Sequence, residues 1–165
     1  MTDFQTLIGA LATGEVEFVI VGGLAATVHG SARLTQDIDV VYARDDANFA
    51  CLADSLTPFA PYPRGAPPGL PFEWSVQTIR RGLNFTLTTT VGDIDLLGEI
   101  TGGGGYANLL PHTIEIELFG QRCRCLDLES LIRTKRAAGR PRDLQMLAEL
   151  EALLEERDAL GPDPF

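Results

Sequence analysis

Two aspartates stand inside an apolar segment that otherwise reads as a β-strand. Asp37 and Asp39 alternate with apolar residues in DIDVVYA, residues 37–43, and alternate residues of a strand point to the same side. Two carboxylates side by side repel each other, and removing them from water costs free energy unless a cation meets them. The chain must therefore bring positive charge to this strand, and a divalent metal ion would supply it.

A glycine turn precedes this strand. Residues 17–23, EFVIVGG, form an apolar run that ends in two glycines, which is typical of a buried strand and a tight turn into a helix. We expect that short helix over residues 24–30. Gly22 and Gly23 leave backbone N–H groups free for phosphate oxygens, and their missing side chains let a ligand approach the backbone. A phosphate-holding turn beside a metal-holding strand indicates phosphoryl or nucleotidyl transfer.

The aspartate half of this pattern also has a simpler interpretation. Asp37 could cap the end of the strand, and Asp39 could form an ion pair with Arg33. The two halves together, one short helix apart, favour the combined metal and phosphate site.

A third carboxylate is expected from VGDIDLLGEI, residues 91–100. Residues 83–90 and 92–100 read as two strands of a hairpin that turns at Val91 and Gly92. Asp93 follows Gly92 at the expected turn, where Gly-Asp is ordinary hairpin chemistry, so we interpret Asp93 as a turn residue. Asp95 lies within the strand, and we predict that it binds metal and accepts the proton of an attacking hydroxyl.

The remaining pattern predicts an α+β fold. Apolar residues at helical spacing predict helices over residues 3–13 and after Asp45 or Asp46, and residues 127–157 read as two helices that are broken near Gly139. The alternating segments TIEIELFG and QRCRCLD form a further hairpin. The segment APYPRGAPPGLP, residues 60–71, is predicted to be a loop because it is rich in proline and glycine.

We expect one domain over residues 1–165, which is long enough to bury a core without disulfides. A small mixed β-sheet with flanking helices would form its core, about residues 15–126. A C-terminal helical pair would cover about residues 127–157.

The charge balance bears on the partners of the protein. Thirteen basic and 23 acidic residues give a net charge of −10, so an RNA substrate would need a local basic patch. Five cations within residues 133–142 form either such a patch or a solvated helix face. No apolar run approaches the roughly 20 residues that cross a bilayer, and residues 1–18 lack the pattern of a signal peptide. We therefore expect a cytoplasmic protein without membrane contact.

The motifs resemble those of a known superfamily. GGLAATVHGSARLTQDIDV, residues 22–40, resembles the signature of the DNA polymerase β-type nucleotidyltransferases, which is a glycine turn, a spacer and Asp-x-Asp. The fuller pattern of GG, HG, RxTxDID, DLL, LIxxK and GRxxD is similar to a small bacterial group related to the AbiEii toxins of abortive-infection systems. The resemblance implies the nucleotidyltransferase fold and a Mg²⁺-dependent reaction, with Mn²⁺ as an alternative ion.

The resemblance also implies a role for each matching position. The glycine turn would cradle a triphosphate, three carboxylates would bind the metal, and nearby polar and basic side chains would contact phosphate. The matching residues are Gly22 and Gly23 in the turn, Asp37, Asp39 and Asp95 as metal ligands, and Arg33, Thr35, Lys135 and Arg140 at the phosphates. Asp143 is expected to orient Arg140 or to cap the last helix. The superfamily commonly has serine as its second turn residue, and Gly23 lacks that hydroxyl.

We expect a nucleotidyltransferase that moves a nucleoside monophosphate from a nucleoside triphosphate to an acceptor hydroxyl. The acceptor could be a tRNA 3′ end, a protein side chain or a small molecule. The family likeness suggests the toxin of a toxin–antitoxin pair, with an antitoxin protein as partner. A nucleotide-binding regulatory module with weak or no activity is the alternative, and a metal-dependent phosphate-ester hydrolase is a third interpretation.

Overall fold

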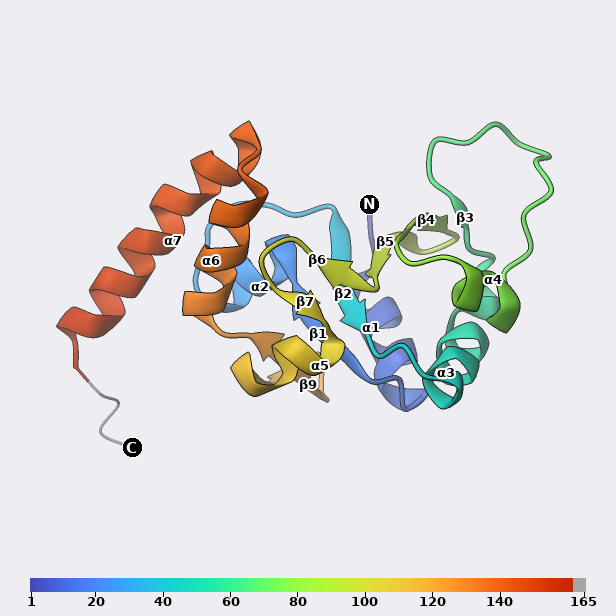
Figure 1. Cartoon of the computed structure of the whole chain (residues 1–165), viewed down its shortest axis with the longest axis horizontal. Helices are drawn as coiled ribbons and strands as arrows, with labels where there is room; N and C mark the ends of the chain where they lie inside the picture. Colours follow the sequence, from blue (N-terminus) through green and yellow to red (C-terminus); the bar gives the residue numbers. More distant parts are fainter. Residues whose placement is uncertain (162–165) are drawn as a thin grey trace.

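A mixed β-sheet forms the centre of the molecule (Figure 1). The computed structural model describes residues 1–161. Within that range the sheet has seven strands in the order β3-β4-β5-β2-β1-β9-β8, and β6 and β7 form a separate two-stranded ribbon. The strands are β1 (Phe18–Val21), β2 (Asp37–Tyr42), β3 (Tyr62–Pro63), β4 (Phe85–Thr89), β5 (Gly92–Leu97), β6 (Glu99–Ile100), β7 (Gly104–Gly105), β8 (Thr113–Leu118) and β9 (Gln121–Leu126).

Helices lie toward both ends of the molecule in Figure 1, with α6 and α7 packed together at one end and α3 and α4 at the other. Four helix N-termini are capped by side chains that accept hydrogen bonds from backbone N–H groups, those of Asp3, Asp45, Ser75 and Asp127. The helices are α1 (Phe4–Thr13), α2 (Gly22–Val28), α3 (Asp46–Leu56), α4 (Val76–Arg81), α5 (Tyr106–Leu109), α6 (Leu128–Ala138) and α7 (Pro141–Ala159). None of the helices between residues 1 and 161 is long and apolar enough to cross a membrane.

Strand β2 lies in the middle of the sheet, between β1 and β5. It runs antiparallel to β1 and parallel to β5. The parallel register sets Asp37 opposite Asp93 and Asp39 opposite Asp95. Because side chains alternate along each strand, all four carboxyl groups project from the same face of the sheet.

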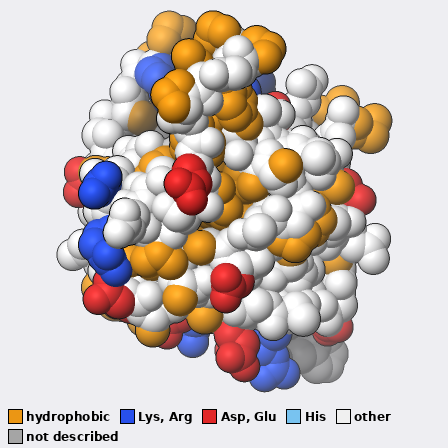
Figure 2. All heavy atoms as spheres, turned by 90° about the vertical axis from the view of Figure 1, so that its right-hand side faces the viewer, with side chains coloured by type: hydrophobic (Ala, Val, Ile, Leu, Met, Phe, Trp, Pro, Cys, Tyr) orange, Lys and Arg blue, Asp and Glu red, His pale blue; other side chains and the backbone are white. Residues whose placement is uncertain are grey.

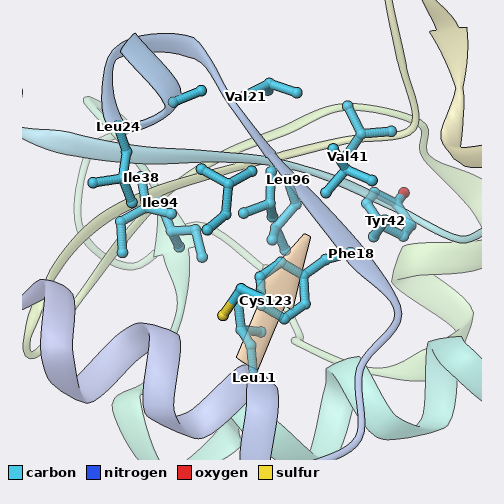
Figure 3. Close-up of a cluster of buried hydrophobic side chains, with 14 of the residues drawn as sticks. Leu11, Phe18, Val21, Leu24, Ile38, Val41, Tyr42, Ile94, Leu96 and Cys123 are labelled. Atoms are coloured by element: carbon cyan, nitrogen blue, oxygen red, sulfur yellow. The ribbon is translucent and has the colours of Figure 1, made fainter. Parts of the chain in front are cut away.

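The intervening residues of these strands face the hydrophobic core. Ile38 and Val40 of β2 and Ile94 and Leu96 of β5 are completely buried. Figure 3 shows Ile38, Ile94 and Leu96 in one cluster with side chains of β1 and with Leu11 of α1. This burial fixes the register, because a shift by one residue would turn the carboxyl groups into the core.

The structure confirms the predicted α+β fold with a mixed sheet and a C-terminal helical pair. Both predicted hairpins are present, as β4–β5 and β8–β9. Helix α6 ends at Gly139, whose left-handed backbone (φ +65°) suits a helix C-terminus, and α7 begins at Pro141. Helix α2 begins at Gly22, two residues before the predicted position, so the glycines lie inside the helix.

The interpretation of Asp93 as a turn residue is wrong. The hairpin turn lies at Thr90 and Val91, and β5 already includes Gly92 and Asp93. The Gly-Asp pair suggested a turn from local chemistry alone, whereas pairing with β2 extends the strand back to Gly92.

The proline-rich segment is anchored to the sheet, so residues 60–71 are not wholly a loop. Tyr62 and Pro63 form the edge strand β3, a place that tolerates proline. Beyond β3 the chain leaves the body in a long loop (Figure 1), and Figure 2 shows hydrophobic side chains over the upper part of this side of the molecule. The Tyr62 hydroxyl donates to the Pro67 carbonyl oxygen. This anchoring keeps Arg64, which follows β3, next to the sheet.

Ile94→Ala should lower the free energy of unfolding by about 2–5 kcal/mol. Ile94 is completely buried in the centre of the sheet, so truncation leaves a cavity. Ile114→Ala on β8 is the matched control, because Ile114 is 39% exposed and its truncation should cost about 1 kcal/mol or less. Urea-induced unfolding followed by circular dichroism measures both losses, and equal losses would contradict the core position of Ile94.

Candidate functional site

Four carboxyl groups gather on one face of the sheet. Asp37 and Asp39 of β2 face Asp93 and Asp95 of β5, and we call these four residues the carboxylate array. One oxygen from each of Asp37, Asp39 and Asp95 lies within 4.8 Å of the other two. The structure thus brings together the three residues predicted as metal ligands, although they come from separate parts of the sequence.

The carboxylate array has the chemistry of a divalent cation site. Asp39 Oδ1 and Asp95 Oδ1 are buried and, within residues 1–161, have no hydrogen-bond partner in suitable geometry, whereas buried polar atoms nearly always have one. Carboxylate oxygens are the ligands that hard cations such as Mg²⁺ prefer. A cation among Asp37, Asp39 and Asp95 would use the free lone pairs and offset the repulsion, so these residues fit such an ion.

Protonation relieves the repulsion when no cation is bound. Burial, followed by the effects of the Asp37 and Asp95 carboxyl groups, raises the pKa of Asp39 to about 8. Burial and the proximity of Asp95 also raise the pKa of Asp37, against the opposing effect of Arg64. The metal-free array therefore retains a proton near neutral pH.

The glycine turn lies directly against the carboxylate array. Gly22 has a left-handed backbone with φ +65°, which residues with a side chain rarely adopt. A Cβ atom on Gly22 would lie 2.1 Å from Asp39 Oδ2. Glycine at this position therefore makes room for the Asp39 carboxyl group, in addition to the predicted approach of phosphate.

Thr35 lies where a side chain of residue 23 would be. A Cβ atom on Gly23 would come within 2.8 Å of Thr35 Oγ1. The Thr35 hydroxyl donates to the Asp37 carbonyl oxygen at 3.0 Å. Another part of the chain thus places a hydroxyl beside the turn, close to where a serine at residue 23 would carry its own.

Asp143 positions the two predicted phosphate-binding cations of the C-terminal helices. Its buried carboxylate accepts hydrogen bonds from Lys135 Nζ at 3.3 Å and from Arg140 Nε at 2.6 Å. It also accepts the Arg140 backbone N–H at the start of α7, so it orients Arg140 and caps the helix, as predicted. Burial alone would raise the pKa of Asp143, but the hydrogen bonds from Arg140 and Lys135 outweigh burial and the pKa is lowered.

Arg33 contacts helix α7 and not Asp39. Its Nε lies 3.7 Å from a Glu149 carboxylate oxygen, and its Nη2 donates to the Gln145 carbonyl oxygen at 3.3 Å. The simpler interpretation, an ion pair between Asp39 and Arg33, is therefore wrong.

Arg64 is a cation of the site that sequence analysis missed. Its guanidinium nitrogens lie 2.8 Å from Asp95 Oδ1, 3.4 Å from Asp93 Oδ2 and 3.7 Å from Asp37 Oδ2. A single arginine within a proline-rich segment gives no pattern that would have identified it. Only the pairing of β3 with β4 brings Arg64 beside the carboxylate array.

Two cavities open beside the array, and both volumes are typical of small-molecule sites. The smaller cavity, about 380 Å³, has apolar walls next to Gly22, and these include Val21, Leu97, Ile100 and Leu131. The larger cavity, about 520 Å³, reaches Asp37 and Asp95 and adds the cations Arg33, Arg64 and Arg142. The residues that line both cavities are Asp39, Lys135, Arg140 and Asp143.

The sheet and helices define a nucleotidyltransferase-like fold. The chain superposes on the crystal structure of an antigenic nucleotidyltransferase-like protein from Paracoccidioides brasiliensis with a TM-score of 0.55. The match covers 93% of this chain and 78% of that chain at 15% sequence identity, which establishes similarity of fold. No protein-family profile matches the sequence, and no curated protein matches it.

Gly22→Ala should weaken divalent-cation binding by at least about tenfold, because the new Cβ would displace the Asp39 carboxyl group. Gly120→Ala is the matched control. Gly120 also has a left-handed backbone, with φ +76°, but a Cβ there would have no atom of residues 1–161 within 4 Å. Isothermal titration calorimetry with Mn²⁺ measures both affinities, and equal losses would show that the contact with Asp39 does not matter.

The free energy of unfolding of the metal-free protein should fall as the pH rises from about 4 to about 8. Asp39 keeps its proton up to about pH 8 in the folded state, whereas its ordinary pKa is 3.8. Over this range the folded state binds more protons than the unfolded state, so raising the pH favours unfolding. Asp39→Asn should flatten the slope in urea unfolding measured at several pH values with a chelator present. An unchanged slope would assign the effect to other groups.

Proposed function

We propose that the protein is a metal-dependent nucleotidyltransferase, which moves a nucleoside monophosphate from a nucleoside triphosphate to an acceptor hydroxyl. The observation that carries the proposal is the meeting of Asp37, Asp39 and Asp95 within 4.8 Å of one another, next to the Gly22 turn. The nucleotidyltransferase-like fold supports it.

Asp37, Asp39 and Asp95 would hold Mg²⁺, or Mn²⁺ in its place. When bound, the ion would supply positive charge against the phosphate oxygens. The chain supplies further charge from Lys135 and Arg140, which line both cavities and suit a polyphosphate that passes between them.

The two cavities suit the two substrates. The smaller cavity combines apolar walls with polar groups and suits the nucleoside. Gly22 and Gly23 would offer backbone N–H groups to the triphosphate. The Thr35 hydroxyl, which donates to the Asp37 carbonyl oxygen, would turn from that acceptor to the phosphate. The larger cavity contains Asp95 and suits the acceptor.

In the reaction, Asp95 would accept the proton of the acceptor hydroxyl as that oxygen forms a bond to the α-phosphorus. The bond from the α-phosphorus to the oxygen that bridges it to the β-phosphorus would break, and pyrophosphate would leave. Lys135 and Arg140 would stabilise the negative charge that develops on the leaving group.

A tRNA 3′ end, a protein side chain and a small molecule are the candidate acceptors. Arg33, Arg140 and Arg142 at the larger cavity provide the local positive charge that an RNA would need on a chain of net charge −10. On the AbiEii-like sequence motifs we further propose a cytoplasmic toxin that pairs with an antitoxin protein.

A nucleotide-binding regulatory module is the second candidate, and Gly23 in place of the common serine favours it. Such a protein would bind a nucleotide and not turn it over.

Label transfer tests the proposal. The protein would be incubated with Mg²⁺, each of the four α-labelled nucleoside triphosphates, and a cell lysate that contains RNA and protein. We expect label in one macromolecular fraction, and at least about 100-fold less with Asp37→Asn/Asp39→Asn, because that variant loses two of the three predicted metal ligands. Asp45→Asn/Asp46→Asn at the start of α3 is the matched control, since it removes two carboxylates remote from the array and should keep activity.

Other outcomes separate the alternatives. Nucleotide binding without any transfer, including to small molecules of the lysate, would favour the regulatory module. Release of free nucleoside monophosphate without a labelled acceptor would favour a hydrolase.

A further inference from the structure

Arg64 is held above the sheet by β4. Its backbone N–H donates to the Thr86 carbonyl oxygen at 3.0 Å, and its Nη2 donates to the Leu87 carbonyl oxygen at 2.8 Å. Only 27% of the side chain is exposed. The guanidinium therefore has a defined place on the sheet, unlike that of a solvated surface arginine.

Arg64 interacts with the carboxylate array through electrostatic attraction. Its Nη2 lies 2.8 Å from Asp95 Oδ1, and its Nε lies 3.4 Å from Asp93 Oδ2. Yet neither Arg64 Nε nor Asp95 Oδ1 has a hydrogen bond of suitable geometry to any group in the described part of the chain. Arg64 thus offsets negative charge and leaves the Asp95 lone pairs available to another cation.

Few other cations of the described chain lie close enough to the carboxylate array to offset its negative charge. Lys135 and Arg140 also lie near the array, but both are paired with the Asp143 carboxylate, at 3.3 Å and 2.6 Å. Among residues 1–161, Arg64 is the cation within ion-pair distance of the carboxylate array.

We propose that Arg64 is a built-in counter-cation of the carboxylate array. It holds the array together in the metal-free protein, and it lowers the affinity of the array for a divalent cation, which must bind beside a fixed positive charge. Asp93 accompanies Arg64 as its balancing charge, since it contacts Arg64 and is not one of the three residues that fit the ion. The inference rests on the proposed function only in that the array binds a divalent cation.

The direction in which cation affinity changes when Arg64 is removed distinguishes a counter-cation from a residue that orients a metal ligand. If Arg64 acted by orienting Asp95 as a ligand, its removal would weaken cation binding. As a counter-cation it opposes the bound ion, so its removal strengthens binding and destabilises the metal-free fold.

The test measures the Mn²⁺ affinity by isothermal titration calorimetry, and the melting temperature in the presence of a chelator, on the full chain. Arg64→Gln should bind Mn²⁺ at least about tenfold more tightly than the original protein. Without metal, it should melt at a lower temperature. Arg64→Lys keeps the charge and should lie between the two. Arg80→Gln on α4 is the matched control, because it breaks an exposed ion pair with Asp46 and should leave the Mn²⁺ affinity unchanged.

The double variant Arg64→Gln/Asp93→Asn removes one charge of each sign. It should recover much of the melting temperature and bring the Mn²⁺ affinity back toward the original value, so it keeps the test valid even if Arg64→Gln alone does not fold. An Arg64→Gln protein that binds Mn²⁺ equally or more weakly than the original would overturn the inference while leaving the proposed function intact. Failure of the original protein and of every variant to bind Mn²⁺ would overturn the metal site itself, and the counter-cation with it.

Discussion

Repulsion among four carboxyl groups is the constraint to which the rest of the site responds. The parallel register of β2 and β5 places them on one face of the sheet, and the core on the opposite face prevents the strands from slipping. Asp39 responds by retaining a proton, with its pKa raised to about 8. Gly22 has no side chain and so leaves room for the Asp39 carboxyl group, and Arg64 lies within ion-pair distance of three of the four carboxylates. A bound cation would take over much of this compensation.

The positive charges around the carboxylate array come from elements that have no local relationship to it. Arg64 follows the edge strand β3, whereas Lys135 and Arg140 come from the C-terminal helical pair. Asp143 holds the last two through hydrogen bonds at the point where α6 and α7 meet. The C-terminal helices therefore contribute together to the walls of both cavities.

Local patterns predicted the elements that hold the site, because alternation and glycine position are properties of short segments. The strand at DIDVVYA, the hairpin that carries Asp95 and the break near Gly139 all follow from such patterns. The prediction failed at Asp93, where a Gly-Asp pair suggested a turn and pairing with β2 extended the strand. It also missed the edge strand β3, since a two-residue strand that includes proline has no recognisable pattern.

The sequence by itself determined the α+β class, the two strands that carry the carboxylates and the glycine turn beside them. These features depend on hydrophobic periodicity and on the position of glycine, which are properties of residues close together in the chain. The tertiary structure alone decided which charges meet. Strand register made Asp93 the neighbour of Asp37, strand pairing placed Arg64 over the array, and close packing put the Thr35 hydroxyl beside Gly23. These contacts join residues that are distant in the chain, and their geometry exists only once the sheet has formed.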